Sequence, residues 1–561
     1  MQEIPAFTSQ VQRLSDFWRL CLLHYTRPTS PCCESKMTSF DVIISGLGPT
    51  GATLACLLGQ SGLRVGVFDR MPDLYPLPRA IGLDHEAMRI VQELGLAELM
   101  GETIAPYRPS EYRGMDGELI KRLDTLPEPH LLSWSPNYVF DQPSFERILR
   151  ARLENLPQVK VFLEADVQTT GQNSQHAWAD VVLKGDEAAT RFEAAYIVAC
   201  DGGSSPIRKR LGIELEDLDF DEHWLVVDAI VTDEKIQHLP QTQVQYCEAA
   251  RPSTFVVGPG NHRRWEVMLL EGDSLSPEFP EDELWPLLER WLKPGDARLW
   301  RAAAYRFHGL VAKQWRRGRI LLAGDAAHMT PPFMAQGMVS GMRDAHNLAW
   351  KLALVTKGRS PECLLDTYFE EREPHVRQII STSMALGRII CERDPHKAIE
   401  RDQRLRAAHG GEVKTEYRQN MIPDIQHGVI AKGALAAGTL FPQPFVTAGA
   451  FHGRLDDLTG PRVLVLVAAG ISETERSGYL EALESVEGRL VELVNDASAS
   501  TQAGPSFCIS ETRPLLGPWL EKLGQRAVVV RPDHCIYGTA ENHMAGLEML
   551  IELKVTLGCQ S

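Results

Sequence analysis

The chain has 561 residues, a formal net charge of −16 and a hydrophobic content of 44%. This balance is typical of a globular protein of several domains and excludes a disordered or fibrous chain. The negative charge argues against nucleic acid as a partner, and the longest apolar runs are far shorter than the roughly 20 residues of a membrane-spanning helix.

The cysteine pattern and the N-terminal residues indicate where in the cell the protein is expected. Eleven cysteines without a C-x-x-C pair favour a reduced, cytoplasmic protein over a disulfide-bonded secreted one. Residues 1–38 lack the charged start and apolar stretch of a signal peptide. We expect this extension to be disordered or not native, with Met37 as the natural start; a helical arm over residues 11–24 is the alternative.

A strand, a glycine turn, a helix and a second strand follow in close succession. The two strands are predicted at residues 41–44 and 64–68, and the helix is predicted at 52–60. This order is a βαβ unit, the setting in which a G-x-G-x-x-G turn has a physical role.

Each residue of that motif has a reason for its place. Gly46 permits the tight turn, Gly48 lets the backbone approach a pyrophosphate, and Gly51 allows the helix to pack closely on the strand. Asp69, 23 positions after Gly46, can accept hydrogen bonds from an adenosine ribose. The pattern predicts a dinucleotide site but does not distinguish NAD from FAD, and a turn without ligand is the alternative.

Two later motifs favour FAD. A buried strand ends at Asp201, ahead of a helix that begins near residue 205. A second strand ends at Gly324-Asp325, where the carboxylate can bind the hydroxyls of a ribityl chain. Pro332 stiffens the loop that follows, and the helix beginning at Gly337 can direct its N-terminal dipole toward the electron-rich edge of a reduced flavin.

The remaining elements suggest two further regions. Short strands alternate with turns over residues 215–307, which predicts an antiparallel sheet. Residues 401–450 show little periodicity and are expected to be a linker. Strands at 463–467 and 527–530 alternate with helices at 477–486 and 542–553, which predicts a small α/β domain.

Taken in this order, the three motifs resemble the single-component (group A) flavoprotein hydroxylases. Residues 75–84, 140–143 and 332–338 resemble in particular the 3-(3-hydroxyphenyl)propionate/3-hydroxycinnamate hydroxylase branch. The resemblance spans roughly residues 40–393. It implies a mixed α/β fold: a Rossmann-like FAD-binding domain interleaved with an antiparallel-sheet substrate domain, then a thioredoxin-like domain without C-x-x-C. The expected ranges are 39–215 with 308–400 for the FAD-binding domain, 216–307 for the substrate domain and 451–561 for the thioredoxin-like domain.

The resemblance also implies which residues hold the cofactor. Arg79 would reach the pyrophosphate and Gln142 the ribityl chain. The sequence departs from the family pattern at Ala335, where glycine is usual, and this bears on the fit beside the flavin ring. The full set expected to bind FAD is Gly46, Gly48, Pro49, Thr50, Gly51, Asp69, Arg70, Arg79, Gln142, Asp201, Gly324, Asp325, Pro332, Gly337 and Met338.

The chemistry implied is hydroxylation of a phenolic ring. NADH or NADPH would reduce FAD, O₂ would give a flavin C4a-hydroperoxide, and its distal oxygen would pass to the ring. A substrate like 3-(3-hydroxyphenyl)propionate, in aromatic catabolism, is expected. The alternatives are a polyketide or antibiotic-type polycyclic phenol and a non-catalytic flavin-binding protein; a halogenase is disfavoured because its Trp-x-Trp-x-Ile-Pro segment is absent.

An active-site base would activate the phenol. His308 is the first candidate and His328 the second, although both can equally be packing residues. Tyr246 and Trp265 can line the pocket, but core packing explains them better. No His/Cys spacing predicts a metal site. The expected partners are the aromatic substrate and O₂, with a homodimer as one expectation for the assembly.

Overall fold

The computed structural model describes residues 39–276, 278–408, 410–498 and 504–558. The predictions for residues 1–38 lie outside these ranges. Among the helices of the described residues, none combines the length and apolar composition that crossing a bilayer requires.

The first sheet has eight strands and a largely parallel centre. Val42, Ile43 and Ile44 of its central strand are fully buried, as a parallel strand covered on both faces requires. In spatial order the main path is β17 (Arg316–Arg317), β18 (Ile320–Leu322), β11 (Thr190–Ala199), β1 (Ser39–Ser45), β2 (Val65–Asp69) and β8 (Val159–Leu163), with β10 (Ala177–Val182) and β9 (Asp166–Gln172) branching from β11.

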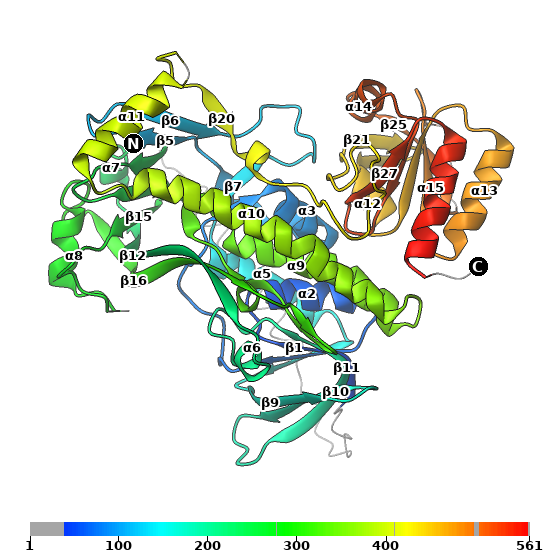
Figure 1. Ribbon diagram of the computed structural model, residues 1–561, viewed down its shortest axis with the longest axis horizontal. Helices are drawn as coiled ribbons and strands as arrows, with labels where there is room; N and C mark the ends of the chain where they lie inside the picture. Colours follow the sequence, from blue (N-terminus) through cyan, green and yellow to red (C-terminus); the bar gives the residue numbers. More distant parts are fainter. Residues whose placement is uncertain (1–38, 277, 409, 499–503, 559–561) are drawn as a thin grey trace, which may run out of the picture. The chain divides into compact units, whose positions relative to one another are not determined.

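Helices cover this sheet. The predicted Rossmann-like unit is present as β1, α2 and β2, with β1 and β2 parallel in the register Val42 to Val65. Helix α2 packs against α5 and α9, and α10 runs beside α9 (Figure 1). The helices of this part are α2 (Pro49–Gln60), α3 (His85–Glu93), α4 (Ala97–Met100), α5 (Gln142–Glu154), α6 (Pro206–Arg210), α9 (Gly337–Thr356) and α10 (Asp366–Ile390). The next helix, α11 (Pro395–Ala407), packs against the second sheet instead.

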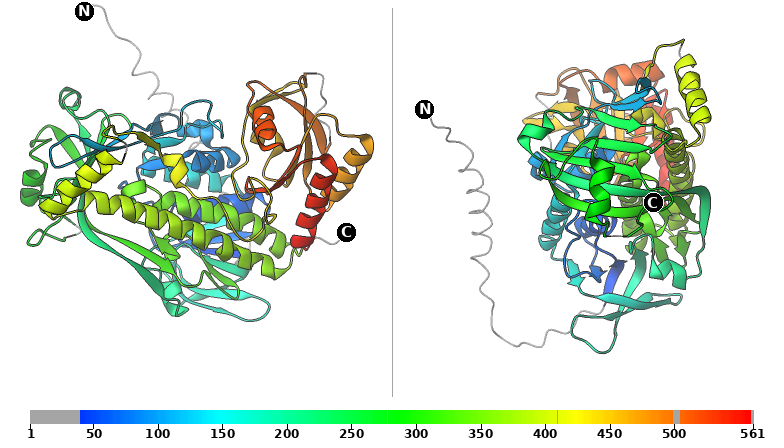
Figure 2. Two further views of the ribbon diagram at one scale, coloured as in Figure 1. Left: turned by 45° about the horizontal axis from the view of Figure 1, so that its top comes forward. Right: turned by 90° about the vertical axis from the view of Figure 1, so that its left-hand side faces the viewer.

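The second sheet has nine strands, and its green strands face the viewer on the right of Figure 2. Its long antiparallel pair, β12 and β16, places Trp224 opposite Tyr305. The order is β19 (His328–Met329), β16 (Ala297–Ala312), β12 (Leu215–Val231), β15 (His262–Met268), β14 (Ser253–Val257), β13 (Gln243–Tyr246), β5 (Ser110–Arg113), β6 (Leu119–Asp124) and β20 (Thr415–Tyr417).

The antiparallel character predicted for residues 215–307 is confirmed by the pairing of β12, β14, β15 and β16. The sheet also includes β5 and β6 from earlier in the chain and β20 from the segment predicted to be a linker. Two short helices, α7 (Asp233–Ile236) and α8 (Glu281–Leu288), lie within this region. A separate three-stranded sheet has the order β3 (Gly82–Asp84), β7 (Asn137–Phe140) and β4 (Ile104–Pro106).

The C-terminal sheet has a thioredoxin-like core. Its strands β27-β26-β23-β24 have the directions of that fold: β23 and β24 are parallel, and β26 is antiparallel to both β23 and β27. The full order is β22 (Phe451–Arg454), β21 (Phe445–Ala448), β25 (Ser506–Glu511), β24 (Arg489–Leu493), β23 (Leu464–Ala468), β26 (Ala527–Val530) and β27 (Ile536–Ala540).

Both faces of this sheet are buried. Val465 and Val467 of β23 pack in one apolar cluster, whereas Leu464 and Leu466 pack in another, as the two-residue period of a strand dictates. The first cluster includes Trp350 of α9. The helices here are α12 (Leu455–Thr459), α13 (Glu473–Glu484), α14 (Leu516–Leu523) and α15 (His543–Thr556), and α13 packs beside α15.

Candidate cofactor and substrate site

The glycines between β1 and α2 have different neighbours. A side chain at Gly46 would place its Cβ 2.3 Å from the Cys200 carbonyl oxygen, and one at Gly51 would lie 2.1 Å from the Gly46 carbonyl oxygen. Gly46 also has a φ of 102°, which favours glycine. At Gly48 a Cβ would meet nothing within 4 Å. Gly46 and Gly51 are therefore required by the fold, whereas Gly48 leaves space for a ligand.

Asp69 holds this turn from the end of β2. Its carboxylate accepts hydrogen bonds from the backbone N–H of Leu47 at 2.6 Å and of Met71 at 2.8 Å. Helix α2 begins without a side-chain cap at Gly48. The positive end of the helix dipole is thus available to a phosphate, as in dinucleotide-binding turns.

A long cavity of about 560 Å³ runs past this turn. Its volume is in the range of sites that hold cofactors and drug-sized ligands. Of the predicted residues, those that line it are Gly46, Gly48, Pro49, Thr50, Asp69, Arg70, Arg79, Gln142, Asp201, Asp325, Pro332, Gly337, Met338 and His308.

Two of the residues predicted to bind FAD do not line the cavity. Gly51 lies behind the turn, in the packing role already described. Gly324 has a φ of 62°, and a side chain there would meet the Thr50 hydroxyl at 2.6 Å. Its lack of a side chain allows the start of α2 to come close to the Gly-Asp turn.

Arg79 and Gln142 meet at the cavity wall. The Gln142 Oε1 accepts hydrogen bonds from the backbone N–H of Arg79 at 2.9 Å and of Ala80 at 2.5 Å, while its Nε2 donates to Glu146. The guanidinium of Arg79 stacks on Tyr75, 4.4 Å from the ring centroid. Gln142 therefore holds the loop that carries Arg79.

Two carboxylates occupy the ends of β11 and β18. Asp201 Oδ2 accepts a hydrogen bond from the Ile207 N–H at 3.2 Å, and its Oδ1 is buried without a partner among the described residues. Burial raises the pKa of Asp201. Asp325 is exposed to the cavity, and desolvation by the surrounding protein raises its pKa as well. The buried Oδ1 of Asp201 requires a hydrogen-bond donor, and ligand hydroxyls in the cavity would supply donors to both carboxylates.

These features fit FAD. The open space at Gly48, the unsatisfied Asp201 oxygen and the start of the 20-residue helix α9 at Gly337 lie along one cavity. An extended ligand with a phosphate-bearing part and a hydroxylated chain matches this arrangement of donors and acceptors.

At Ala335, where the family usually has glycine, the structure has a backbone conformation that favours glycine. Ala335 adopts a left-handed backbone with a φ of 53°, the conformation in which glycine is favoured. It lines the long cavity between Pro332 and Gly337. Its methyl group faces Gly82, where an added Cβ would lie only 2.8 Å away.

The two histidines differ in their surroundings. His308, on β16, lines the long cavity, and burial together with Arg306 lowers its pKa. His328 is fully buried and does not line the long cavity or the smaller cavity described below. Its Nε2 lies 2.7 Å from Asp344 Oδ2. Asp344 also accepts a hydrogen bond from the Gly324 N–H at 3.0 Å, so His328 belongs to the support of the Gly-Asp turn.

Core packing explains the two aromatic residues proposed for the sheet. Trp265 has no exposed surface and contacts Phe255, with ring centroids 5.4 Å apart. Tyr246 packs on Trp291, with centroids 5.5 Å apart. Both rings belong to one apolar cluster of this sheet, which agrees with core packing, and neither lines the long cavity.

The sequence reasoning missed a charged wall of the cavity. Arg264, Glu266 and Arg301 are buried and line it. Arg264 donates to buried Asp228 at 2.7 Å and to the Arg79 carbonyl at 2.9 Å, so it supports the Arg79 loop. The strand period could have indicated this wall. Arg264 and Glu266 flank the buried Trp265 on β15, so their side chains lie on the face of the sheet opposite to that of Trp265.

A second, smaller cavity of about 70 Å³ adjoins the first. The two cavities share Ile81, Glu266, Pro332 and Ala335 as wall residues. Burial raises the pKa of Glu266. The other polar side chains around the small cavity are Tyr107, Ser110, Asn137, Tyr138, Gln243, Gln245, Thr254, Gln336 and Arg418.

Comparison with known proteins agrees with this geometry. Residues 39–383 match the family described as FAD binding domain, and residues 438–550 match the HcaD C-terminal domain. A probable NADH-specific resorcinol 4-hydroxylase of Rhodococcus jostii (strain RHA1) is 36% identical, over 90% of this chain and 93% of that protein. A 3-(3-hydroxy-phenyl)propionate/3-hydroxycinnamic acid hydroxylase of Comamonas testosteroni is 32% identical, over 90% and 95%.

Solved structures share the fold. The flavin-dependent monooxygenase PieE, in complex with FAD and substrate, superimposes with a TM-score of 0.76 at 19% identity, over 93% of this chain and 99% of that one. OxyS anhydrotetracycline hydroxylase from Streptomyces rimosus gives 0.71 at 22% identity, over 92% and 99%. The fold class expected from the sequence, FAD as the cofactor and the family resemblance are confirmed. The chain belongs to the FAD-dependent aromatic hydroxylases and is a flavin-dependent aromatic monooxygenase.

Proposed function

We propose that the enzyme hydroxylates a phenol with a single aromatic ring, and that the ring lies where the small cavity meets the long one. The observation that carries this proposal is the small cavity itself, about 70 Å³ with polar walls. An apolar cavity of about 150 Å³ holds benzene. One ring would therefore extend into the long cavity at Glu266, and a polycyclic substrate would require the walls to move.

With FAD held by the cavity-lining residues, the site would use a hydride from NADH, a proton and O₂, placing one oxygen atom on the ring while the other leaves as water. One NADH and one O₂ are thus consumed for each hydroxyl group added. The work of the protein is to orient the ring and exclude water. We assign the FAD contacts to the cavity-lining residues named above, with Gly51 and Gly324 acting through packing.

Arg418 favours a substrate with an acidic side chain. It is buried at the small cavity, donates to the Met334 carbonyl at 2.6 Å and to the Tyr107 hydroxyl at 3.2 Å, and its Nε has no partner among the described residues. A carboxylate on the substrate would satisfy this donor in a charge-assisted hydrogen bond. We therefore propose a compound like 3-(3-hydroxyphenyl)propionate as the substrate, within aromatic catabolism.

Resorcinol is the second candidate. It is favoured by the 36% identical relative, whose name specifies both resorcinol and NADH. That relative also supports NADH over NADPH as the reductant of this enzyme. The polycyclic alternative has less support, because the small cavity would have to expand.

For the active-site base we propose Glu266 ahead of His308. Glu266 lies on the wall common to both cavities, where the ring is expected, whereas His308 lines the long cavity alone. Burial raises the pKa of Glu266, which makes it a stronger base than an exposed glutamate once ionised. The role predicted for His308 stays a proposal.

Substrate-stimulated NADH oxidation, with the hydroxylated product and H₂O₂ both measured, tests the proposal. The panel comprises 3-(3-hydroxyphenyl)propionate, resorcinol, simple phenols and polycyclic phenols, each with NADH and NADPH. We expect product equal to NADH consumed for a single-ring phenol. NADH consumption that gives only H₂O₂ with every single-ring phenol, or coupled turnover of a polycyclic phenol, would contradict it.

Arg418→Met separates the two candidates. If a substrate carboxylate binds Arg418, KM for 3-(3-hydroxyphenyl)propionate rises by about 10- to 150-fold, because a charge-assisted bond of ~1.5–3 kcal/mol is lost. Turnover of resorcinol serves as the internal control for an intact site. An unchanged KM for the propionate would refute the carboxylate contact while leaving the hydroxylase assignment in place.

The remaining expectations stay predictions. These are a homodimer, a cytoplasmic location from the cysteine pattern, and the domain boundaries given above.

A further inference from the structure

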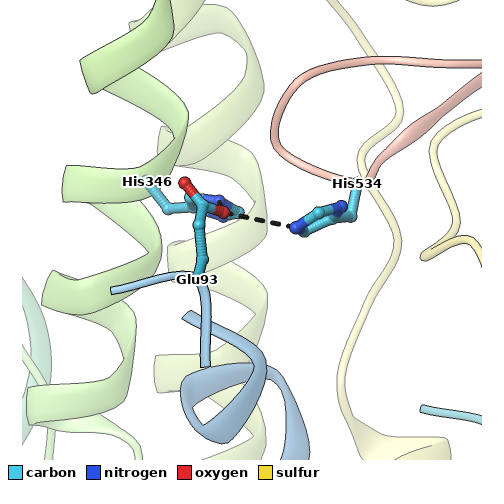
Figure 3. A group of neighbouring side chains, drawn as sticks. All are labelled: Glu93, His346 and His534. Atoms are coloured by element: carbon cyan, nitrogen blue, oxygen red, sulfur yellow. Dashed lines mark hydrogen bonds and ion pairs between the residues drawn. The ribbon is translucent and has the colours of Figure 1, made fainter. Parts of the chain in front are cut away.

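Two histidines and a glutamate from distant parts of the chain converge outside both cavities. Glu93 ends α3, His346 lies within α9, and His534 lies in the turn between β26 and β27 (Figure 3). The Glu93 Oε2 lies 2.9 Å from His346 Nε2 and 3.2 Å from His534 Nε2. Each residue offers one ligand atom, and the three atoms lie within 4.8 Å of one another. Each side chain is 7–8% exposed.

The geometry points to a binding site for a divalent transition-metal ion, with Zn²⁺ the best match. Two imidazole nitrogens and one carboxylate oxygen are a common Zn²⁺ ligand set, which leaves a fourth position for water. Tetrahedral bonds of about 2.1 Å separate neighbouring ligand atoms by roughly 3.4 Å. The two observed separations from Glu93 need to change by only a few tenths of an ångström to reach that value.

The local charges also favour a cation. Arg89 pairs with Asp456 through its Nε and Nη2, at 2.5 and 2.9 Å, and Arg531 pairs with Asp533 at 2.6 Å. Among the described residues, Glu93 has no lysine or arginine within ion-pair distance, and only the two imidazoles contact its carboxylate as charged partners. A bound divalent ion would compensate this buried negative charge.

The backbone at His534 adds to the argument. Its φ of 60° is left-handed, a conformation that costs a non-glycine residue free energy and that glycine adopts freely. A large side chain is nevertheless present at this turn, directed at Glu93. The bound ion would link α3 and α9 of the FAD-binding part to the β26–β27 turn of the thioredoxin-like sheet.

Zn²⁺ binding to the full-length, FAD-loaded enzyme tests the site. The protein carries no polyhistidine tag and is first dialysed against a chelator; Zn²⁺ is then titrated against a competing indicator. We expect one Zn²⁺ for each chain. Co²⁺ in its place should add visible absorption at longer wavelengths than the flavin, as tetrahedral Co²⁺ does.

The variants are His534→Gly and Glu93→Gln. His534→Gly removes a ligand and suits the left-handed backbone, so it should keep its fold and its flavin absorbance while Zn²⁺ affinity falls ~100-fold or more. Glu93→Gln should lose Zn²⁺ to a similar extent. His452→Gln alters an exposed histidine of the same sheet and should change nothing. No Zn²⁺ uptake by the wild type, or equal uptake by the wild type and both ligand variants, would overturn the proposal.

Discussion

A substitution at Gly48 should weaken FAD binding without destabilising the fold. Its backbone, with φ of −72° and ψ of −177°, is open to any residue, and a Cβ there meets no protein atom within 4 Å. Gly48→Ala should therefore fold as well as the wild type, or gain about 0.4–1 kcal/mol from a less flexible unfolded chain. The methyl group would instead occupy the space through which the pyrophosphate approaches the backbone. Loss of one charge-assisted hydrogen bond, about 1.5–3 kcal/mol, corresponds to a roughly 10- to 150-fold weaker Kd for FAD.

Two measurements on the apoprotein check this prediction. Thermal unfolding without FAD should give the variant a Tm equal to or above that of the wild type, and FAD titration followed by flavin fluorescence should give the weaker Kd. Gly51→Ala provides the contrast, because its Cβ would lie 2.1 Å from a backbone oxygen and should destabilise the apoprotein itself. Unchanged FAD affinity in Gly48→Ala would refute the assignment of this turn to the pyrophosphate.

Three further changes have defined outcomes. Ala335→Gly should raise the free energy of unfolding by up to about 1 kcal/mol in urea denaturation, because it removes the cost of a left-handed alanine; a loss of stability would contradict this. Glu266→Gln should become more stable than the wild type as pH rises above about 4.5. The pKa of Glu266 is raised in the folded state, so the folded protein disfavours the ionised carboxylate. The stability that protonated Glu266 contributes is therefore complete below its unfolded pKa and is lost as pH rises through its folded pKa. A Tm difference between variant and wild type that stays flat from pH 5 to 8 would disprove it. Glu371→Gln should cost about 3–5 kcal/mol, because it leaves Lys351, at 2.9 Å, and Arg531, at 2.8 Å, buried without their shared carboxylate. A variant as stable as the wild type in guanidinium denaturation would show that the network reorganises.

Much of the cofactor site was accessible from the sequence because its signals are local. The β1–α2 turn is specified by three glycines within six residues, two of which meet backbone oxygens that leave no room for a side chain. Helix α9 begins at Gly337, the start predicted from the sequence. The role of Gln142 was less accessible, because its amide holds the loop at residues 79–80, which lies some sixty residues earlier in the chain.

Sequence alone therefore determined the strand–turn–helix units, since steric limits and hydrophobic periods act between residues only a few positions apart. The identity of the cofactor followed from three such local motifs taken together and from the family that they resemble. Tertiary structure alone decided which side chains converge from distant segments. Glu266 and Arg418 reach one small cavity across about 150 positions, and Glu93, His346 and His534 meet across more than 400. No short-range pattern encodes such meetings, because they depend on how the sheets and helices pack against one another.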